Sequence, residues 1–330
     1  MKIVIPGGSG RIGHVLAGHF HDRGEQVTVL SRTPRQAPWA VAAWTGRDLG
    51  SWIDAIGGAD VVINLAGRSV DCRYTPANRK EIMDSRVQST RAIGAAIARV
   101  VHPPALWLNA STATIYRHSL DRPMDEATGE IGGGEHGEPA TWKFSIDVAT
   151  AWERTLFGAA TPRTRKIAMR SAIVTIASRD GWFGKLMNLV RCGLGGPAGP
   201  GTQYMSWIHE ADFIRAVEFL IKREDLDGCV NLASPNPLPN RDFMGALRKA
   251  YGMPFGPQLS VWMLKIGTVL LRTEAELVLK SRRVVPRRLL EAGFEFVCPR
   301  WEDAAEDLIR RWRALPENQG QRHAEQKARR

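Results

Sequence analysis

The sequence predicts an α/β protein built on a doubly wound, Rossmann-like parallel sheet, with a smaller and mainly helical C-terminal lobe. Short apolar runs alternate with stretches of helical periodicity as far as about residue 235, which is typical of repeated βαβ units. The first apolar run leads straight into a glycine-rich turn and then into a helical pattern. Beyond the proline-rich segment 235–239 the alternation stops, and helical patterns dominate to about residue 315.

The glycine-rich turn follows the first predicted strand and has the spacing Gly7-x-x-Gly10-x-x-Gly13. Gly7 permits a tight turn, Gly10 lets backbone N–H groups approach a phosphate, and Gly13 lets the helix pack close to the strand. The helix begins with Arg11 and Ile12, and the positive end of its dipole faces the same anion. An ordinary glycine turn is the alternative, but a second predicted strand at the expected distance favours a dinucleotide-binding unit.

The residues after the second predicted strand, 26–30, indicate which dinucleotide binds. Sites for NAD place a carboxylate there, whereas the 2′-phosphate of NADP needs cations. Here Ser31, Arg32 and Arg35 follow the strand without a carboxylate. Since guanidinium groups bond phosphate oxygens in a two-pronged geometry, the sequence predicts NADP as the cofactor. A solvated basic turn is the alternative interpretation.

Later strands end where the same cofactor is expected to lie. A third strand is predicted within residues 39–44, and Leu49 after it is placed near the adenine on a weaker signal. The nearly all-apolar run 59–67 predicts a fourth strand buried on both faces. A fifth strand is predicted over residues 105–110. The complete predicted cofactor site is Gly7, Gly10, Arg11, Ile12, Gly13, Ser31, Arg32, Arg35, Leu49, Leu65, Ala66, Gly67 and Ala110.

The remaining elements follow in alternation. We predict a long helix over 76–100, an irregular excursion over 117–139, a helix over 141–157, a sixth strand at 166–170, a glycine-rich pocket wall over 181–201, a helix over 212–222 and a strand at 229–233. This organisation predicts a dinucleotide-binding domain of residues 1–175 and 205–235. Residues 176–204 and 236–315 form the predicted substrate-binding lobe, and residues 316–330 a disordered basic tail.

Composition narrows the class of partner. The 330 residues carry a net charge of +11, much of it in the cluster 280–288 and in the basic tail. Because no aromatic residues interleave with these cations, nucleic acid is disfavoured and a solvated basic face near an anionic cofactor is expected. The four scattered cysteines, the lack of a signal pattern and the short apolar runs predict a cytoplasmic protein outside the membrane. The histidines of the first helix have no acidic or cysteine partner, so no metal site is expected.

Several motifs together resemble the epimerase-like branch of the extended short-chain dehydrogenase/reductase superfamily, whose members carry a C-terminal domain of unknown function. The motifs are the glycine turn, Asn64-Leu65-Ala66-Gly67, Arg73-Tyr74-Thr75, Arg79-Lys80, Ser85-Arg86, Ala110-Ser111, Trp152-Glu153, Ser206-Trp207-Ile208-His209, residues 231–237 and residues 285–296. The resemblance spans about residues 1–310. It implies a sheet that binds NADP and a C-terminal lobe that binds substrate. A homodimer formed through the long helices is an expectation from the resemblance alone.

The resemblance also bears on catalysis. Active members of the superfamily use a Ser or Thr after the fifth strand, and a Tyr with a Lys four residues later on the next helix. Aligned on these motifs, Thr112 takes the Ser/Thr role, but Ser145 and Ala149 occupy the Tyr and Lys positions. Neither can replace the pair, because a serine hydroxyl is too weak an acid and alanine carries no charge.

Two functions are therefore compatible with the sequence. The first is an NADP-dependent oxidoreductase or epimerase acting on a small polar substrate, with sugar nucleotides among the candidates. Its candidate catalytic residues are Thr112, Tyr116 and His209, with Tyr204 as a further donor and Arg73, Arg79 and Lys80 as receivers of a substrate anion. Packing is the alternative role for Tyr116, and helix capping is the alternative for His209. The second function is a non-catalytic NADP(H)-binding sensor.

Overall fold

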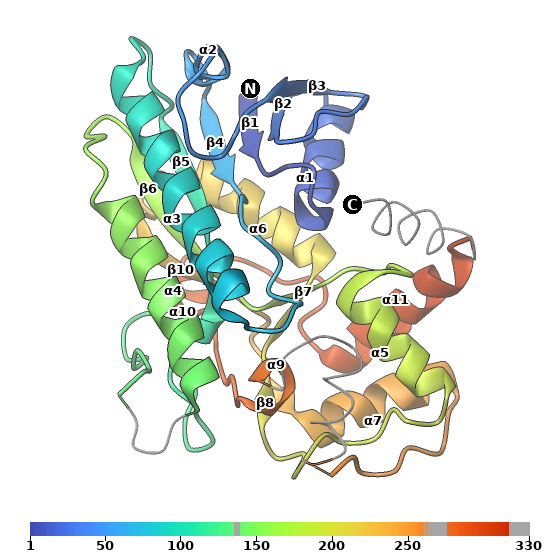
Figure 1. Cartoon of the computed structure of the whole chain (residues 1–330). Coiled ribbons are helices and arrows are strands. Elements are labelled where there is room, and N and C mark those ends of the chain that lie inside the picture. The colour runs from blue at the N-terminus through green and yellow to red at the C-terminus, as the bar shows by residue number, and fades with distance from the viewer. Residues whose placement is uncertain (135–138, 261, 263–275, 317–330) are drawn as a thin grey trace.

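The central sheet contains seven parallel strands in the computed structural model, which describes residues 1–134, 139–260, 262 and 276–316 (Figure 1). Their spatial order is β10-β6-β5-β4-β1-β2-β3, so the chain winds outward from β1 in one direction and then in the other. This topology confirms the predicted doubly wound fold. The strands are β1 (Lys2–Pro6), β2 (Gln26–Ser31), β3 (Ala40–Ala43), β4 (Val61–Asn64), β5 (Leu106–Thr112), β6 (Arg165–Ser171) and β10 (Gly228–Leu232).

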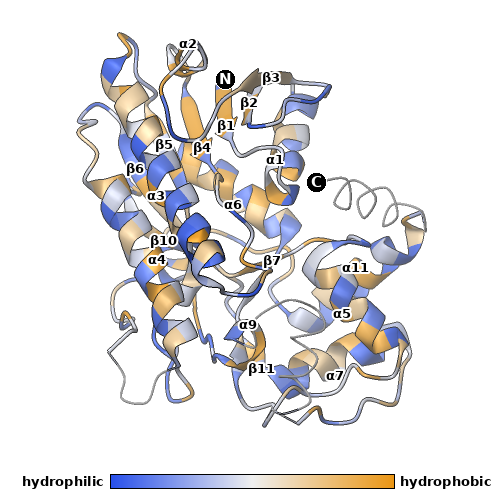
Figure 2. Ribbon diagram, in the orientation of Figure 1, coloured by the Kyte–Doolittle hydropathy of each residue, from blue (hydrophilic) through white to orange (hydrophobic). Residues whose placement is uncertain are grey.

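Helices cover both faces of the sheet. Ile3 and Ile5 of β1 pack with α1 (Arg11–Asp22) and α6 (Glu210–Lys222), whereas Val4 points to the opposite face. That opposite face is covered by α3 (Pro76–Arg99) and α4 (Ala140–Phe157), which lie side by side (Figure 1). Because both faces are covered, the central strands are hydrophobic along their length, as Figure 2 shows for β1 and β4.

The long helix α3 begins at a strong sequence signal. Thr75 caps it, since its hydroxyl oxygen accepts a hydrogen bond from the Asn78 N–H at 3.3 Å. Pro76 follows at the first helical position, where its missing N–H costs nothing. The structure thus places this helix where its sequence pattern predicts it.

Three helices build the C-terminal lobe: α5 (Gly181–Arg191), α7 (Asn240–Tyr251) and α11 (Trp301–Ala314). Their shared core is aromatic. The Trp301 ring stacks on Phe243 with 3.8 Å between ring centroids, and meets Trp207 edge-on at 4.9 Å. Most of the apolar stretch 261–271 and the predicted basic tail lie outside the described residues.

Shorter elements connect these layers. They are α2 (Ile53–Ile56), the 3₁₀ helix η1 (Ala113–Ile115), β7 (Ile173–Thr175), β8 (Tyr204–Met205), β9 (Trp207–His209), β11 (Leu238–Pro239), α9 (Glu276–Leu279) and α10 (Arg287–Glu291). β7 pairs with β9 in parallel, and β8 pairs with β11 in antiparallel orientation. None of the helices in the described ranges combines the length and the apolar character needed to cross a membrane.

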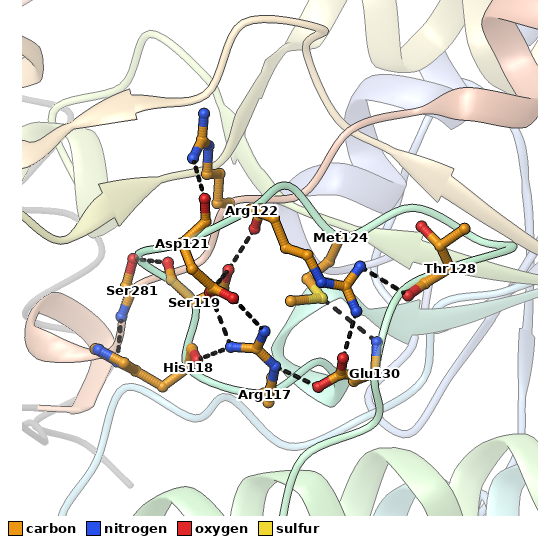
Figure 3. Close-up of polar contacts among 10 residues, drawn as sticks. Arg117, His118, Ser119, Asp121, Arg122, Met124, Thr128, Glu130 and Ser281 are labelled. Carbon is orange, nitrogen blue, oxygen red and sulfur yellow. Dashed lines mark hydrogen bonds and ion pairs between the residues drawn. The ribbon is translucent and has the colours of Figure 1, made fainter.

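The basic segment after α9 is only in part the solvated face that the sequence suggested, since Arg287 is exposed but two other cations are buried. Lys280 is 0% exposed and Arg282 is 8% exposed. The segment instead packs against the irregular excursion after β5, and Val284 forms a β-bridge with Met124. Figure 3 shows the join: the Ser281 N–H donates to His118 Nδ1 at 3.1 Å, and its hydroxyl donates to the Ser119 carbonyl oxygen. The expectation was wrong for Lys280 and Arg282, because charge composition does not reveal which cations find buried acceptors.

The excursion itself is tied together by ion pairs. Arg117 lies between Asp121 and Glu130, and Arg122 also contacts Glu130 (Figure 3). These ion pairs connect residues 117–130 of the excursion with one another. The same residues pack against the segment that follows α9.

Candidate active site

The glycine turn lies at the carboxyl end of β1, and two of its glycines are required by the protein's own backbone. Gly7 has φ +76°, and a Cβ added there would lie 2.7 Å from the backbone N and Cα of Ala66. A Cβ on Gly13 would lie 2.5 Å from the Cα of Gly8. At Gly10 the nearest protein atom would be 3.4 Å away, an ordinary contact. Open space over Gly10, at the N-terminus of α1, fits a pyrophosphate held by backbone N–H groups.

The carboxyl end of β2 lies beside this turn. Ser31 is buried, and its hydroxyl lies 3.3 Å from that of Ser9 and 3.1 Å from the carbonyl oxygen of Thr33. Arg32 and Arg35 follow on an exposed stretch. The position of Arg32 at the strand end suits a 2′-phosphate, so the residues present fit NADP. Ser31 forms part of the turn that presents these guanidinium groups.

The other predicted cofactor residues are distributed around the same edge. The Ala66 N–H donates to Asn64 Oδ1 at 3.1 Å, which fixes the loop after β4 against Gly7. Leu65 and Ile12 pack on one core and Ala66 on the other, while Ala110 lies partly buried on β5. Leu49 packs among the apolar residues around Trp44 and Trp52. The structure brings the glycine turn and the loop after β4 together.

Arg11 reaches from the first helix toward the C-terminal lobe. Its guanidinium occupies the space that a Cβ of Gly181 would fill, at the start of α5. Nearby, Lys185 of α5 forms an ion pair with Asp71 at 2.5 Å. The C-terminal lobe therefore contacts the nucleotide-binding part of the protein beside the glycine turn, through the side chains of Arg11 and Lys185.

A partly open cavity of about 200 Å³ lies next to the end of β5. Its lining residues are Val70, Tyr74, Ile82, Arg86, Ser111, Thr112, Thr114, Phe144, Ser145, Val148, Trp152, Glu276 and Arg282. A larger hollow of about 920 Å³ lies at the opposite edge, around Met1, Ala105 and Gly228. We favour the small cavity as the active site, because ligands of such sheets bind at the carboxyl ends of the strands.

Tyr74 supplies a phenol to this cavity from the loop that precedes α3. Burial is the main cause that raises its pKa to about 12, and the charge of Glu276 adds to it. Its ring meets Phe144 edge-on at 5.2 Å, and its hydroxyl interacts with that of Ser145. A phenol with this pKa is protonated at neutral pH and can only donate its proton.

Two guanidinium groups and one carboxylate also line the cavity. Arg282 lies 3.7 Å from Glu276, and its Nε donates to the Thr114 hydroxyl at 3.1 Å. Glu276 in turn accepts a hydrogen bond from Ser145 at 2.8 Å. Arg86 lies over the Trp152 ring at 5.1 Å, and burial lowers its pKa to about 10, so it stays charged at neutral pH.

Of the predicted catalytic residues, only Thr112 lines this cavity. Its hydroxyl accepts the Thr114 N–H at 3.1 Å and caps η1. Tyr116 is 2% exposed, and its hydroxyl donates to Asn231 at 3.0 Å while accepting from Arg170 at 2.9 Å. These contacts favour the packing alternative for Tyr116.

His209 ends β9 and is not among the residues that line the cavity. Its Nδ1 accepts the Ala211 N–H at 3.2 Å, so the ring caps α6, as the alternative interpretation proposed. Its Nε2 lies 3.2 Å from Asp307 of α11. Burial lowers the pKa of His209, with Arg311 adding to the effect and Asp307 opposing it. The Arg283 guanidinium lies over the Tyr204 ring, with 4.5 Å between Arg283 Cζ and the centroid of that ring.

The residues at the positions of the usual Tyr and Lys, Ser145 and Ala149, both make contacts within the protein. Ser145 lines the cavity and bonds to Glu276, whereas Ala149 is fully buried among apolar side chains. Sequence reasoning missed Tyr74, Glu276 and Arg282 as site residues, although Arg73-Tyr74-Thr75 was among the motifs of the resemblance. No local spacing connects Tyr74 with Ser145, because the fold alone brings the two elements together.

The fold and the glycine turn define a dinucleotide-binding protein of the extended short-chain dehydrogenase/reductase class. Residues 3–136 match the NAD dependent epimerase/dehydratase family, and residues 261–308 match a domain of unknown function, DUF1731. The chain is 30% identical to the epimerase family protein SDR39U1 of Bos taurus over 320 residues, covering 94% of this chain and all of that protein. The chain therefore belongs to this epimerase family, with a DUF1731 C-terminal domain.

Two further proteins place the chain in the same family. Epimerase family protein SH2119 of Staphylococcus haemolyticus is 28% identical, over 93% of this chain and 99% of that protein. The crystal structure of human SDR39U1 isoform 2 with NADPH superposes with a TM-score of 0.80 at 25% identity, covering 96% of this chain and all of that one. Among the described residues, no three His, Cys, Asp or Glu side chains are arranged to hold a metal ion.

Proposed function

We propose that this protein is an NADP(H)-dependent oxidoreductase that reduces a carbonyl group, with Tyr74 as the proton donor. The observation that carries the proposal is the position of the Tyr74 phenol in a cavity that Thr112 and Ser145 also line. Ser145 stands where active superfamily members have their tyrosine. The phenol of Tyr74, from another element, contacts Ser145 and therefore lies in the same region. The NADPH-bound structure of the human relative supports the choice of cofactor.

The binding of NADP(H) follows from groups already in place. Backbone N–H groups at the start of α1, next to Gly10, would hold the pyrophosphate, and Arg32 would bind the 2′-phosphate. Arg11, which reaches toward Gly181, is close enough to the same edge to neutralise phosphate charge. When bound, NADPH supplies the hydride for the carbonyl carbon.

The residues of the cavity then supply the proton for the carbonyl oxygen. Tyr74 is held neutral by burial, and the phenol donates its proton as negative charge develops on that oxygen. Thr112 at the end of β5 is positioned to donate a second hydrogen bond to the oxygen. Arg86 and Arg282 oppose the rise in the pKa of Tyr74 and stabilise the phenolate that remains.

Cofactor titration and single turnover test this proposal. We expect NADPH to bind at least about tenfold more tightly than NADH, a difference of roughly 1.4 kcal/mol, and Arg32→Ala to remove the preference. With a panel of small aldehydes and ketones, Tyr74→Phe should lower the rate of NADPH oxidation about 100-fold or more without changing the Kd for NADPH. Tyr251→Phe, in the C-terminal lobe, is the matched control. Equal rates for the Tyr74→Phe variant and the wild type would contradict the assignment.

A non-catalytic NADP(H) sensor is the second candidate, favoured by the burial of Ala149 and by the bonding of Ser145 to Glu276. The glycine turn that would bind the nucleotide is intact, but the usual catalytic tyrosine and lysine are replaced by Ser145 and Ala149. A protein that binds NADPH with the predicted preference, yet turns over none of the carbonyl compounds, would support the sensor.

A further inference from the structure

We propose that the substrate is a small carbonyl compound with one carboxylate, and that Arg86 binds this carboxylate. The proposal rests on the proposed function, because it assigns the substrate class of the same cavity. It replaces the sugar nucleotide that the family resemblance suggested. Three features of the cavity support it: the neutral partners of the Arg86 guanidinium, the balance of charge among the lining residues, and the volume of the cavity.

Arg86 is a partly buried cation whose partners are neutral. Its Nη1 donates to the carbonyl oxygens of Arg68 and Ile82, both at 3.0 Å. Its guanidinium lies over the Trp152 ring, and the absence of a side chain at Gly67 leaves room for it, since a Cβ there would lie 3.2 Å from Arg86 Cζ. Among the residues that the structure describes, none of the ion pairs involves Arg86. The other guanidinium nitrogens are thus available for a two-pronged bond to a carboxylate.

The balance of charge in the cavity points to one negative charge on the ligand. Among the lining residues that the structure describes, Arg86, Arg282 and Glu276 are the charged ones. The Glu276 carboxylate lies against Arg282, so these two charges compensate each other. The positive charge of Arg86 remains, and the walls beside it are formed by Phe144, Val148 and Trp152. A monoanion with an apolar or aromatic body complements this surface.

The volume limits the size of that ligand. The cavity has a volume of about 200 Å³ and is partly open. A cavity of about 150 Å³ holds benzene, so this one accommodates roughly six to ten non-hydrogen atoms. Pockets for larger ligands enclose about 300–1,000 Å³. A sugar nucleotide does not fit inside this volume as a whole, whereas an oxo acid or an aromatic aldehyde with one carboxylate does.

The experiment compares benzoate with benzamide, which share a shape and differ in charge. Each is titrated calorimetrically into the full-length protein saturated with NADP⁺. We expect benzoate to bind at least about tenfold more tightly than benzamide. Arg86→Gln should remove this preference, Arg86→Lys should restore part of it, and Arg91→Gln, an exposed position on the same helix, should leave it unchanged. Folding of each variant is checked by its thermal unfolding.

The outcomes separate two roles for Arg86: binding the carboxylate of the substrate and binding a phosphate of the cofactor. If Arg86→Gln weakens NADPH binding and leaves the preference for benzoate unchanged, Arg86 binds a cofactor phosphate and the proposal is overturned. Equal binding of benzoate and benzamide, or no binding of either, also overturns it. The proposed function fails by a different result: the benzoate preference persists while Tyr74→Phe has no effect on turnover.

Discussion

Gly10 and Gly13 are three residues apart in the same turn, but they are glycines for different reasons. A side chain on Gly13 would collide with the backbone of Gly8, so the packing of α1 on β1 requires glycine there. A side chain on Gly10 would meet only an ordinary contact with the Gly7 carbonyl oxygen. We therefore expect the constraint on Gly10 to come from the bound nucleotide and not from the fold.

This difference predicts opposite effects of the same substitution. Gly13→Ala should destabilise the protein by about 1–3 kcal/mol, because neither backbone can move without disturbing the sheet. Gly10→Ala should change the free energy of unfolding by less than about 0.5 kcal/mol, yet weaken NADPH binding at least about tenfold. Urea denaturation and calorimetric titration of both variants measure the two quantities. Normal NADPH affinity in Gly10→Ala would argue against a pyrophosphate over this residue.

Tyr74 and Tyr116 are both buried tyrosines near the end of β5, and their surroundings separate their roles. Tyr74 lines the cavity, whereas the Tyr116 hydroxyl is used twice inside the protein, by Asn231 and Arg170. Arg170 in turn forms a two-pronged bond with Glu153, both distances being 2.8 Å. Tyr116 is thus one member of a buried polar network.

For Tyr116→Phe we expect a loss of about 1–3 kcal/mol in the free energy of unfolding, because Asn231 and Arg170 each lose a partner. Turnover and the Kd for NADPH should stay within about twofold of the wild type. The measurement pairs denaturant unfolding with steady-state kinetics, and Tyr74→Phe serves as the comparison. A large fall in kcat with unchanged stability would return Tyr116 to the list of proton donors.

At the scale of elements, the sequence predicted strands and helices well where one segment determines its own structure. The run at β4 is apolar throughout because helices cover both of its faces, and α3 begins at Thr75-Pro76 because these residues cap a helix locally. The segment around Lys280 was predicted wrongly for the converse reason. Its burial depends on Thr114, whose carbonyl oxygen accepts from Lys280 Nζ at 3.0 Å across the fold. The cavity depends on such distant pairs, so only its β5 edge could be predicted.

The join between α6 and α11 also depends on a distant pair, His209 and Asp307. The folded state keeps His209 neutral, because its Nδ1 accepts a hydrogen bond and burial lowers its pKa. The unfolded chain binds a proton at His209 below about pH 6.5, which is the ordinary pKa. The unfolded state therefore binds more protons than the folded state in this range, and stability falls as the pH drops below about 6.5.

His209→Asn should reduce this pH dependence. Asparagine caps helices well, so α6 keeps its start, but the group that titrates is gone. Between pH 7.5 and 5.5 we expect the wild type to lose more stability than the variant, by up to about 1.4 kcal/mol per pH unit below pH 6.5. Glu210 has a pKa raised by burial and Asp307 a lowered one, and both remain in the variant. Urea unfolding at several pH values tests this, and parallel curves would exclude His209 as the cause.

At the scale of the whole molecule, the C-terminal lobe meets the sheet beside the cofactor edge. The ion pair between Lys185 of α5 and Asp71, on the loop between β4 and α3, joins the two parts there. Its side chains are 41% and 35% exposed, so solvent screens much of the attraction. The pair contributes little to overall stability, but it joins the two parts of the protein beside the glycine turn, where we expect it to slow the release of a bound nucleotide.

Breaking this pair should therefore change the rate of cofactor release more than the stability. For Lys185→Met we expect NADPH to dissociate about 2–5-fold faster, which corresponds to roughly 0.4–1 kcal/mol. High salt should bring the wild type closer to the variant, because screening weakens the same attraction. Exchanging the two charges, Asp71→Lys with Lys185→Asp, should restore slow release. Lys80→Met, which breaks an exposed pair with Asp84 within α3, is the control and should leave release unchanged. The dissociation rate is measured by stopped-flow NADPH fluorescence at about 0.05 and about 0.5 M salt. Equal rates for Lys185→Met and the wild type at both salt concentrations would show that this ion pair does not retain the nucleotide.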